Sequence, residues 1–222
     1  MNILTAEDPV EYELEGIGQV HVREDIGYTF ASALRSFLRQ DPEVILVGEI
    51  RDKDTVDIAL KAALTGHLVF STIHTNDAPS TITRLQNMGT PNYLISAALS
   101  LIMAQRLARK TCSECKMIDE NATPKLLNSI GFLPEQSARA KIYKGKGCDH
   151  CNKSGYKGRM GVYEILEVTK ELKQGILSNL GQNELEALAK KGGFKTMHSM
   201  GHDLLLSGDL SFAEYERILS GG

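Results

Sequence analysis

The segment DPEVILVGE, residues 41–49, decides the fold. Its centre, VILV at 44–47, is an unbroken run of aliphatic residues between Asp-Pro on one side and Gly-Glu on the other. Such a run is typical of a strand that is buried on both faces within a parallel sheet. The sequence therefore predicts a core strand here, with the carboxylate of Glu49 just beyond its end.

Strand and helix patterns alternate on both sides of this segment. Apolar residues recur at helical spacing in Tyr28–Gln40, and further helices are expected at 54–64, 78–88 and 93–104. Short apolar runs predict strands at 3–5, 19–22 and 68–73. Alternation of this kind indicates βαβ units. We therefore expect an α/β fold with a mainly parallel sheet.

A change of composition at Thr111 marks a second region. Residues 111–160 hold two cysteine pairs and many Gly and Lys residues, a strand-like run follows at 161–168, and short helices are expected from Thr169 on. We expect three parts, namely a core at 1–110, a tetracysteine region at 111–160 and a carboxyl-terminal helical region at 161–222. Ser211 and Glu214 have the spacing of a capping box for the last helix.

The composition narrows the functional classes. The 222 residues are 42% hydrophobic and 24% charged, which suits a globular core. A net charge of −3 gives no overall attraction to nucleic acid or anionic lipid. The longest apolar run, 93–104, is too short to span a membrane, and the start MNILTAEDP has no signal-peptide pattern. Because this start leads at once into a strand-like run, we expect a chain cut inside a domain.

Polar residues follow three of the predicted strands. The first strand leads to Asp8 and Glu11, the central one to Glu49 and Arg51, and the third to His74. Ligands of open parallel sheets bind beyond the carboxyl ends of the strands. We therefore expect Glu11, Glu49 and His74 to converge on one edge that can bind a metal-bound polyphosphate. The alternatives stay open: Glu49 could cap the next helix or pair with Arg51, and the acidic group after the first strand could be an ordinary turn.

Two histidines flank the third strand. His67 and His74 are separated by seven residues, an odd number, so in one extended strand they would face opposite sides and would not share a metal. His74 lies at the carboxyl end and is the better candidate for sensing a phosphate. A purely structural role is the alternative for both.

Four cysteines form two CxxC pairs, Cys112–Cys115 and Cys148–Cys151. Four thiolates at this spacing fit a closed, structural zinc site, and without a secretory signal we interpret them as thiols and not as disulfides. The competing interpretation is a zinc ribbon for nucleic acid, because many basic residues surround the second pair. Only Tyr143 and Tyr156 could stack on bases there, so we predict no nucleic-acid partner.

A phosphate-binding P-loop is absent from the sequence. That loop needs the pattern G-x-x-x-x-G-K followed by Ser or Thr. Gly145-Lys146 is followed by Gly147 and lies in the cysteine region, so it does not fit.

Four ordered motifs resemble those of the type II secretion / type IV pilus assembly ATPase superfamily. They are ILTAEDPVE (an Asp box), ALRSFLRQDPEVILVGEIRD (a Walker B element), TGHLVFSTIHTNDA (a His box) and the two CxxC pairs. The nearest likeness is to the PilB-like pilus assembly group, with the GspE group of type II secretion next. The resemblance covers nearly the whole chain, apart from the Walker A loop expected before Met1.

The resemblance implies a partial RecA-like core, followed by a zinc subdomain and a small helical subdomain. It implies that Glu11 acts on the attacking water, that Glu49 lies near magnesium and that His67 and His74 couple the γ-phosphate to neighbouring motifs. Asp8 and Arg51 are the expected cofactor-binding residues, and the two CxxC pairs are the zinc ligands. The cofactors would be structural zinc, with magnesium and ATP in the full-length protein.

The resemblance also implies a function. We expect a carboxyl-terminal fragment of a homohexameric, cytoplasmic ATPase, peripheral to the inner membrane, that powers pilin polymerisation through an inner-membrane platform protein. The fragment alone is expected to be inactive because it lacks the P-loop. The alternatives are a type II secretion ATPase that drives pseudopilus assembly and a non-catalytic, zinc-bearing interaction module.

Overall fold

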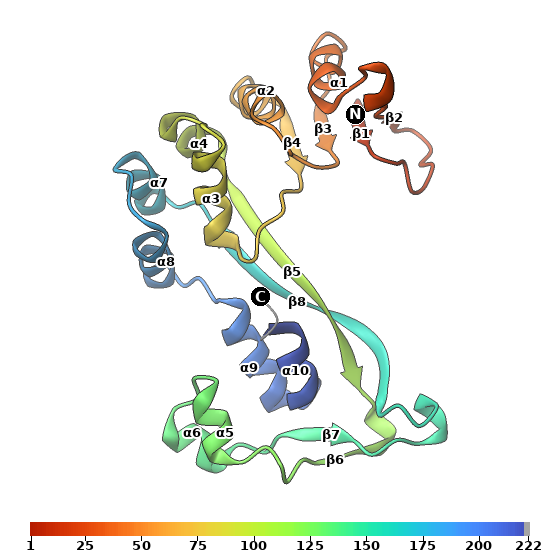
Figure 1. Ribbon diagram of the computed structural model, residues 1–222, viewed down its shortest axis with the longest axis vertical. Helices are drawn as coiled ribbons and strands as arrows, with labels where there is room; N and C mark the ends of the chain where they lie inside the picture. The colour runs from red at the N-terminus through yellow and green to blue at the C-terminus, as the bar shows by residue number, and fades with distance from the viewer. Residues whose placement is uncertain (220–222) are drawn as a thin grey trace. The chain divides into compact units, whose positions relative to one another are not determined.

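The computed structural model describes residues 1–219, and they form two compact units. The first consists of Met1–Ile102 with Leu166–Gly193, and the second consists of Met103–Ile165 with the residues from Phe194 on. Figure 1 shows the elements of both. The predicted division at 110 and 160 stays a prediction, and the last three residues of its third part lie outside the described residues.

The first unit is built on a four-stranded parallel sheet in the order β2-β1-β3-β4. Its strands are β1 (Ile3–Glu7), β2 (Gly18–His21), β3 (Val44–Val47) and β4 (Leu68–Ser71). In register, Thr5 lies beside Leu46, and Leu46 lies beside Phe70. The α/β class and the parallel sheet expected from the sequence are confirmed.

Two helices, α1 (Phe30–Phe37) and α2 (Lys53–Leu64), cover one face of this sheet. Thr29 caps α1 through a capping box with Ser32, and the Asp52 carboxylate caps α2 by accepting the Thr55 backbone N–H at 2.8 Å. The apolar residues of α1 pack on Ile45 and Val47.

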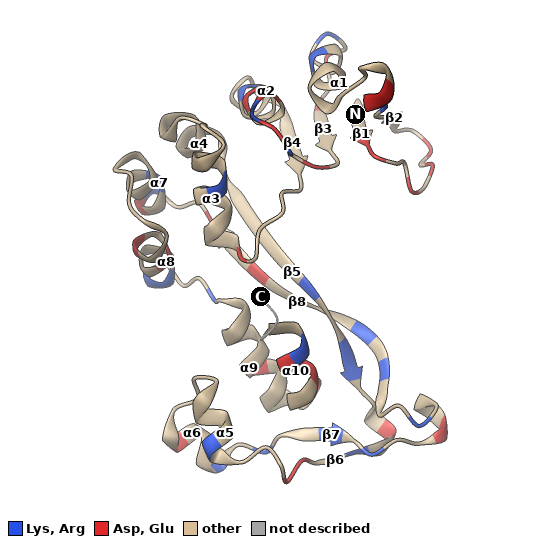
Figure 2. Cartoon of the chain, in the orientation of Figure 1, with Lys and Arg blue, Asp and Glu red and all other residues tan. Residues whose placement is uncertain are grey.

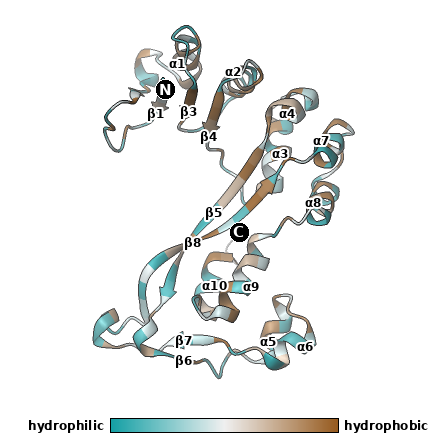
Figure 3. Ribbon diagram, turned by 180° about the vertical axis from the view of Figure 1, so that it is seen from behind, coloured by the Kyte–Doolittle hydropathy of each residue, from teal (hydrophilic) through white to brown (hydrophobic). Residues whose placement is uncertain are grey.

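The other face of the sheet is open, so the expectation that β3 is buried on both faces is wrong for the described residues. Leu46 is 36% exposed and Phe70 is 51% exposed, and Figure 3 shows the hydrophobic character of β3 and β4. The one-sided cover results from the handedness of the connections between the parallel strands. The connections from β2 to β3 and from β3 to β4 move across the sheet in the same direction, and right-handed crossovers then put both helices on one face.

The outer edge of β4 is unpaired within residues 1–219, because β4 hydrogen-bonds only to β3. Leu68, at the start of this edge strand, is 54% exposed.

Four further helices complete the first unit. α3 (Ala78–Asn87) begins at an Asp77 cap, and α4 (Asn92–Ala98) packs on α7 (Lys170–Leu177), which is followed by α8 (Gln182–Lys191). The Ser96 hydroxyl donates to the Lys173 carbonyl at 3.2 Å and so ties α4 to α7.

The predicted helix over 93–104 is correct only in its first half. α4 ends at Ala98, Leu99 is extended, and β5 (Leu101–Thr111) follows. β5 forms a two-stranded sheet with β8 (Tyr156–Glu167). The apolar residues at 101–104 suit a helix or a strand, and pairing with a distant strand decides between them.

The second unit packs short elements around one core. These are β6 (Lys116–Ile118) antiparallel to β7 (Tyr143–Gly145), α5 (Pro124–Ser129), α6 (Pro134–Arg139), α9 (Met197–Ser207) and α10 (Phe212–Leu219). Three 3-10 turns lie at Glu24–Ile26 (η1, in the first unit), Ser113–Cys115 (η2) and Asp149–Cys151 (η3). Tyr215 and Leu205 are fully buried in this core.

The capping box predicted for the last helix is half formed. The Ser211 hydroxyl accepts the Glu214 backbone N–H at 3.2 Å. The Glu214 carboxylate, however, binds Arg109 and Arg217 and does not accept a hydrogen bond from the Ser211 backbone N–H.

None of the helices within residues 1–219 is long and apolar enough to cross a membrane.

We predict that Ile45→Ala lowers the free energy of unfolding by about 2–5 kcal/mol, because it opens a cavity under α1 and α2. Leu46→Ala is the matched control on the open face of the same strand, and it should cost less than about 1 kcal/mol. Urea denaturation followed by circular dichroism measures both. Equal losses for the two variants would contradict the one-sided core.

Candidate functional site

The carboxyl ends of β1, β3 and β4 share one edge of the sheet, and polar side chains gather there. Glu49, two residues beyond β3, accepts a hydrogen bond from Arg51 Nη2 at 2.5 Å through Oε1. Its other oxygen, Oε2, lies 3.2 Å from His74 Nε2, beyond β4. The Glu49 side chain is only 17% exposed, whereas His74 is 87% exposed. Figure 2 shows acidic residues in the segments after β1 and β3.

Arg51 joins two further carboxylates to this cluster. Its Nη2 lies 3.7 Å from Asp8 Oδ2, and its Nη1 lies 3.9 Å from Glu24 Oε1. Glu24 belongs to η1 and was not predicted from the sequence, because no local pattern distinguishes it from an ordinary surface glutamate. The structure thus brings together Asp8, Glu49, Arg51 and His74, and adds Glu24.

Electrostatics keep Glu49 ionised. The hydrogen bond from Arg51 lowers the pKa of the Glu49 carboxyl and outweighs the opposing effect of burial, and His74 adds to the lowering. The same hydrogen bond raises the pKa of Arg51. At neutral pH the edge therefore presents a charged glutamate with both oxygens in contact with partners.

Backbone hydrogen bonds fix the position of Glu49. Gly48 N donates to the Ala6 carbonyl at 2.8 Å, and Ile50 N donates to the Thr72 carbonyl at 2.8 Å, so the ladder extends past β3 on both sides. The Thr72 hydroxyl donates to the Gly48 carbonyl at 2.6 Å. A Cβ at Gly48 would lie 3.0 Å from the Ala6 carbonyl oxygen, so this close approach favours glycine.

Glu11 lies in the exposed loop between β1 and β2 and makes no side-chain hydrogen bond or ion pair within residues 1–219. Glu7, at the end of β1, instead accepts hydrogen bonds from Thr5 and Gln19. The structure therefore does not bring Glu11 into contact with Glu49 or His74.

His67 lies at the opposite end of β4 from His74. Its Nδ1 is 2.9 Å from the Ala62 carbonyl oxygen and 3.1 Å from the Thr65 hydroxyl, at the carboxyl end of α2. These contacts give His67 a helix-capping position. The two histidines do not meet, because they lie beyond opposite ends of β4.

A shallow hollow of about 480 Å³ lies next to the cluster. Its lining includes Glu24, Arg51 and the first residues of α1 and α2. Arg51 is therefore part of the wall of this hollow.

The four cysteines of the second unit form one compact cluster. All four sulfur atoms lie within 4.8 Å of one another. The Sγ–Sγ distances are 3.9 Å for Cys112–Cys148, 3.8 Å for Cys115–Cys151 and 3.7 Å for Cys148–Cys151. Four sulfurs at Zn–S bond length in a tetrahedron are about 3.8 Å apart, so the cluster fits a tetrahedral metal.

The surroundings of the sulfurs also suit a metal centre. Burial raises the pKa of the Cys115 thiol to about 12, whereas backbone N–H groups of Cys148 and Gly155 lower the pKa of Cys151 to about 6. Four neighbouring thiols cannot all ionise without a counter-charge. A divalent cation would supply it, because metal-bound cysteines are thiolates.

The family model described as "Type II/IV secretion system protein" matches residues 1–217. The type IV pilus assembly ATPase PilB of Acinetobacter baylyi is 48% identical over 99% of this chain, and PilB of Pseudomonas aeruginosa is 49% identical over 98%. A putative type II secretion system protein E of Escherichia coli is 45% identical over 99%. The chain spans 38%, 38% and 44% of the lengths of these relatives.

Solved structures share the fold. The pilus retraction motor PilT with bound ADP gives a TM-score of 0.68 at 30% identity, over 97% of this chain and 52% of PilT. The Legionella pneumophila ATPase DotB gives a TM-score of 0.65 at 22% identity, over 100% of this chain and 52% of DotB.

We predict that Arg51→Gln raises the pKa of the Glu49 carboxyl toward its ordinary value of 4.5, because the variant removes the strongest hydrogen bond to the carboxylate. Carbon-detected NMR titration of the glutamate carboxyls measures the change. Arg39→Gln replaces an exposed arginine in the turn after α1 and should leave Glu49 unchanged. An unchanged Glu49 in Arg51→Gln would show that the contact is not populated in solution.

Proposed function

This chain belongs to the type II/IV secretion system protein family, and from that premise we propose that it forms part of an ATP-hydrolysing motor of type IV pilus assembly. One observation carries the proposal: Glu49 is held between Arg51 and His74 at the shared carboxyl edge of β1, β3 and β4. The high identity to two proteins named PilB supports the choice of pilus assembly.

The residues at this edge suit a magnesium–nucleotide. Asp8, Glu24 and Glu49 offer carboxylate oxygens, which are the ligands that magnesium accepts, and Arg51 is a donor for phosphate oxygens. Bound magnesium would supply charge stabilisation for the transferring phosphoryl group. We propose that Asp8 and Arg51 contribute to binding this cofactor.

We propose that each of the remaining predicted residues has a separate role in ATP hydrolysis. Glu49, rigid and ionised, lies near magnesium, and Glu11 orients the attacking water once its exposed loop folds over the edge. His74, in contact with Glu49, relays the state of the γ-phosphate. His67 acts from the other end of β4, by fixing the strand that carries His74.

A phosphate cradle has to come from outside these 222 residues, because the sequence holds no G-x-x-x-x-G-K. Within residues 1–219 no strand pairs with the outer edge of β4, and this supports the proposal, since one more strand could pair there. We therefore propose that this chain alone neither binds nor hydrolyses ATP. Separately, we propose that the working motor is a homohexamer.

The second candidate is a type II secretion ATPase, which the 45% identity to the Escherichia coli secretion protein favours. The cargo would then be pseudopilin in place of pilin. In either case we propose a cytoplasmic motor that is peripheral to the inner membrane and acts on a platform protein there.

We propose that the tetracysteine cluster binds zinc in a structural role. Four thiolate ligands close the tetrahedron and leave no position for a substrate. Backbone N–H groups of Gly147, Cys148 and Gly155 donate to the sulfurs, which supports a preformed centre.

We predict that Glu49→Gln lowers ATP turnover of the full-length protein by at least ~100-fold, because it neutralises a positioned carboxylate. Phosphate release in the presence of magnesium measures the rate. Glu11→Gln is expected to have an effect of the same order, while Glu15→Gln in the same acidic loop is the matched control and should keep normal turnover. Near-normal rates in both Glu49→Gln and Glu11→Gln would favour a non-catalytic interaction module.

We predict one equivalent of zinc per chain by elemental analysis of protein that is purified under reducing, chelator-free conditions. Cys112→Ser should release the metal and make residues 111–160 sensitive to proteolysis, because metal binding supplies folding free energy there. Ser113→Ala, the neighbouring control, should retain the metal. Protein without metal would refute the zinc proposal.

A further inference from the structure

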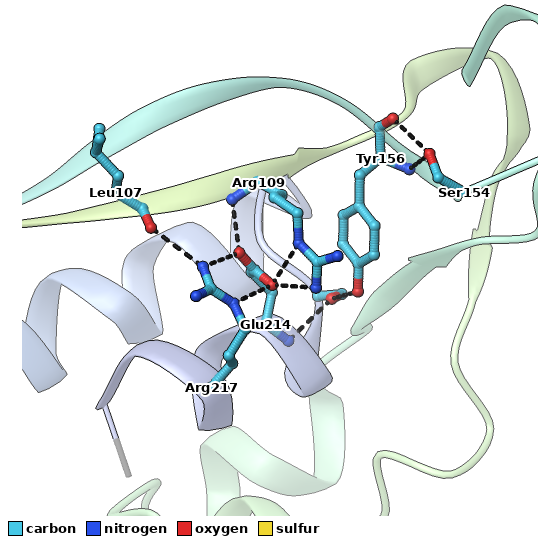
Figure 4. Close-up of polar contacts among 7 residues, drawn as sticks. Leu107, Arg109, Ser154, Tyr156, Glu214 and Arg217 are labelled. Carbon is cyan, nitrogen blue, oxygen red and sulfur yellow. Dashed lines mark hydrogen bonds and ion pairs between the residues drawn. The ribbon is translucent and has the colours of Figure 1, made fainter. Parts of the chain in front are cut away.

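The buried carboxylate of Glu214 is the centre of a network that the functions above do not use. Glu214 lies on α10 and its side chain is 0% exposed. It accepts hydrogen bonds from the Arg109 backbone N–H at 2.7 Å, from Arg109 Nη2 at 2.7 Å and from Arg217 Nη2 at 2.6 Å (Figure 4). Burial alone would raise the pKa of Glu214, but these bonds outweigh it and lower the pKa to about 2.

Such a charge cannot stay buried without its partners. Removing one member of a buried pair leaves an uncompensated charge in a medium of low polarity. The position of α10 is therefore linked to that of Arg109, on β5. Arg217 reinforces the link, because its Nη2 also donates to the Leu107 carbonyl of β5 at 3.2 Å.

Tyr156 fixes Arg109. The Arg109 guanidinium carbon lies 4.2 Å from the centre of the Tyr156 ring, a cation–π contact. The Tyr156 hydroxyl is 3.0 Å from the Ser211 hydroxyl, which accepts the Glu214 backbone N–H. Figure 4 shows Tyr156 beside Arg109 and Glu214. One tyrosine therefore contacts both Arg109 and Ser211, the residue that directly precedes α10.

Tyr156 is also connected to the cysteine cluster, through the preceding residue, Gly155. Gly155 N donates to the Cys151 sulfur at 3.3 Å, and the Gly155 carbonyl accepts the Cys112 backbone N–H at 3.0 Å. On the other strand, Thr111, next to Cys112, donates its N–H to the Asp209 carbonyl at 2.9 Å, just before α10. Two backbone connections therefore lead from the cysteine cluster to α10.

We propose that the tetracysteine centre and α10 form one cooperative unit, in which bound metal fixes the position of the carboxyl-terminal helix through Tyr156, Arg109 and Glu214. The inference rests on the proposed metal binding and goes beyond a local structural role. Metal holds Cys112 and Cys151 together, and these cysteines hold Gly155 and Tyr156 in place. When the metal leaves, Tyr156 no longer supports Arg109, and Glu214 loses the geometry that compensates its burial.

Hydrogen exchange of the full-length protein, with and without metal removal by a chelator, tests this coupling. We expect amides of residues 209–219 to exchange at least tenfold faster after metal removal, while residues 53–64 of α2, in the first unit, change less than twofold. Unchanged exchange in 209–219 would overturn the coupling. Equal acceleration of 53–64 would also overturn it, because metal removal would then destabilise the chain as a whole.

Substitutions of Tyr156 test whether the coupling between the cysteine cluster and α10 passes through this side chain. Tyr156→Leu should keep one equivalent of metal, show fast exchange in 209–219 even with metal bound, and respond little to the chelator. Tyr156→Phe keeps the ring under Arg109 and should keep the response, as should Tyr163→Leu, an exposed tyrosine on the same strand. A normal response in Tyr156→Leu would exclude the route through this side chain, and so would the loss of the response in Tyr163→Leu.

Metal content separates the two proposals. If elemental analysis finds no metal in the wild-type protein, the proposed zinc centre fails and the coupling fails with it. If metal is present and 209–219 do not respond to its removal, only the coupling is refuted.

Discussion

The parallel ladder of β1, β3 and β4 is the constraint on which the candidate site depends. Parallel strands in register present their carboxyl ends at one edge, and residues far apart in the sequence are therefore neighbours there. The ladder continues past β3 through Gly48 and Ile50, so Glu49 projects from backbone that is hydrogen-bonded on both sides. That rigidity distinguishes Glu49 from Glu11, which lies in an exposed loop after a strand of the same sheet.

The sequence predicts the elements of this ladder well, because their signals are local. The run at 44–47 is a strand with those bounds, and the helical spacing at 28–40 becomes α1 with both ends trimmed. Gly48 and Glu49 directly follow β3, as the sequence predicts. The convergence of Glu49 and His74 also follows, since it needs only that β3 and β4 are parallel neighbours.

What the sequence misses depends on contacts between distant residues. The apolar residues after Ala98 suit a helix or a strand, and only pairing with β8 selects β5. Glu24 joins the site through Arg51, 27 positions later, and no local pattern marks it. Glu214 has the spacing of a capping residue, yet its carboxylate binds arginines from β5 and α10. Such ion pairs leave no periodic trace, because they involve single residues on separate elements.

The one-sided cover of the sheet affects the tendency of this stretch of chain to self-associate. Leu46 and Phe70 present an apolar surface beside β4, whose outer edge pairs with no other strand within residues 1–219. This combination is the kind of surface that seeds self-association through strand addition. The isolated chain would therefore be prone to self-association until that surface is shielded.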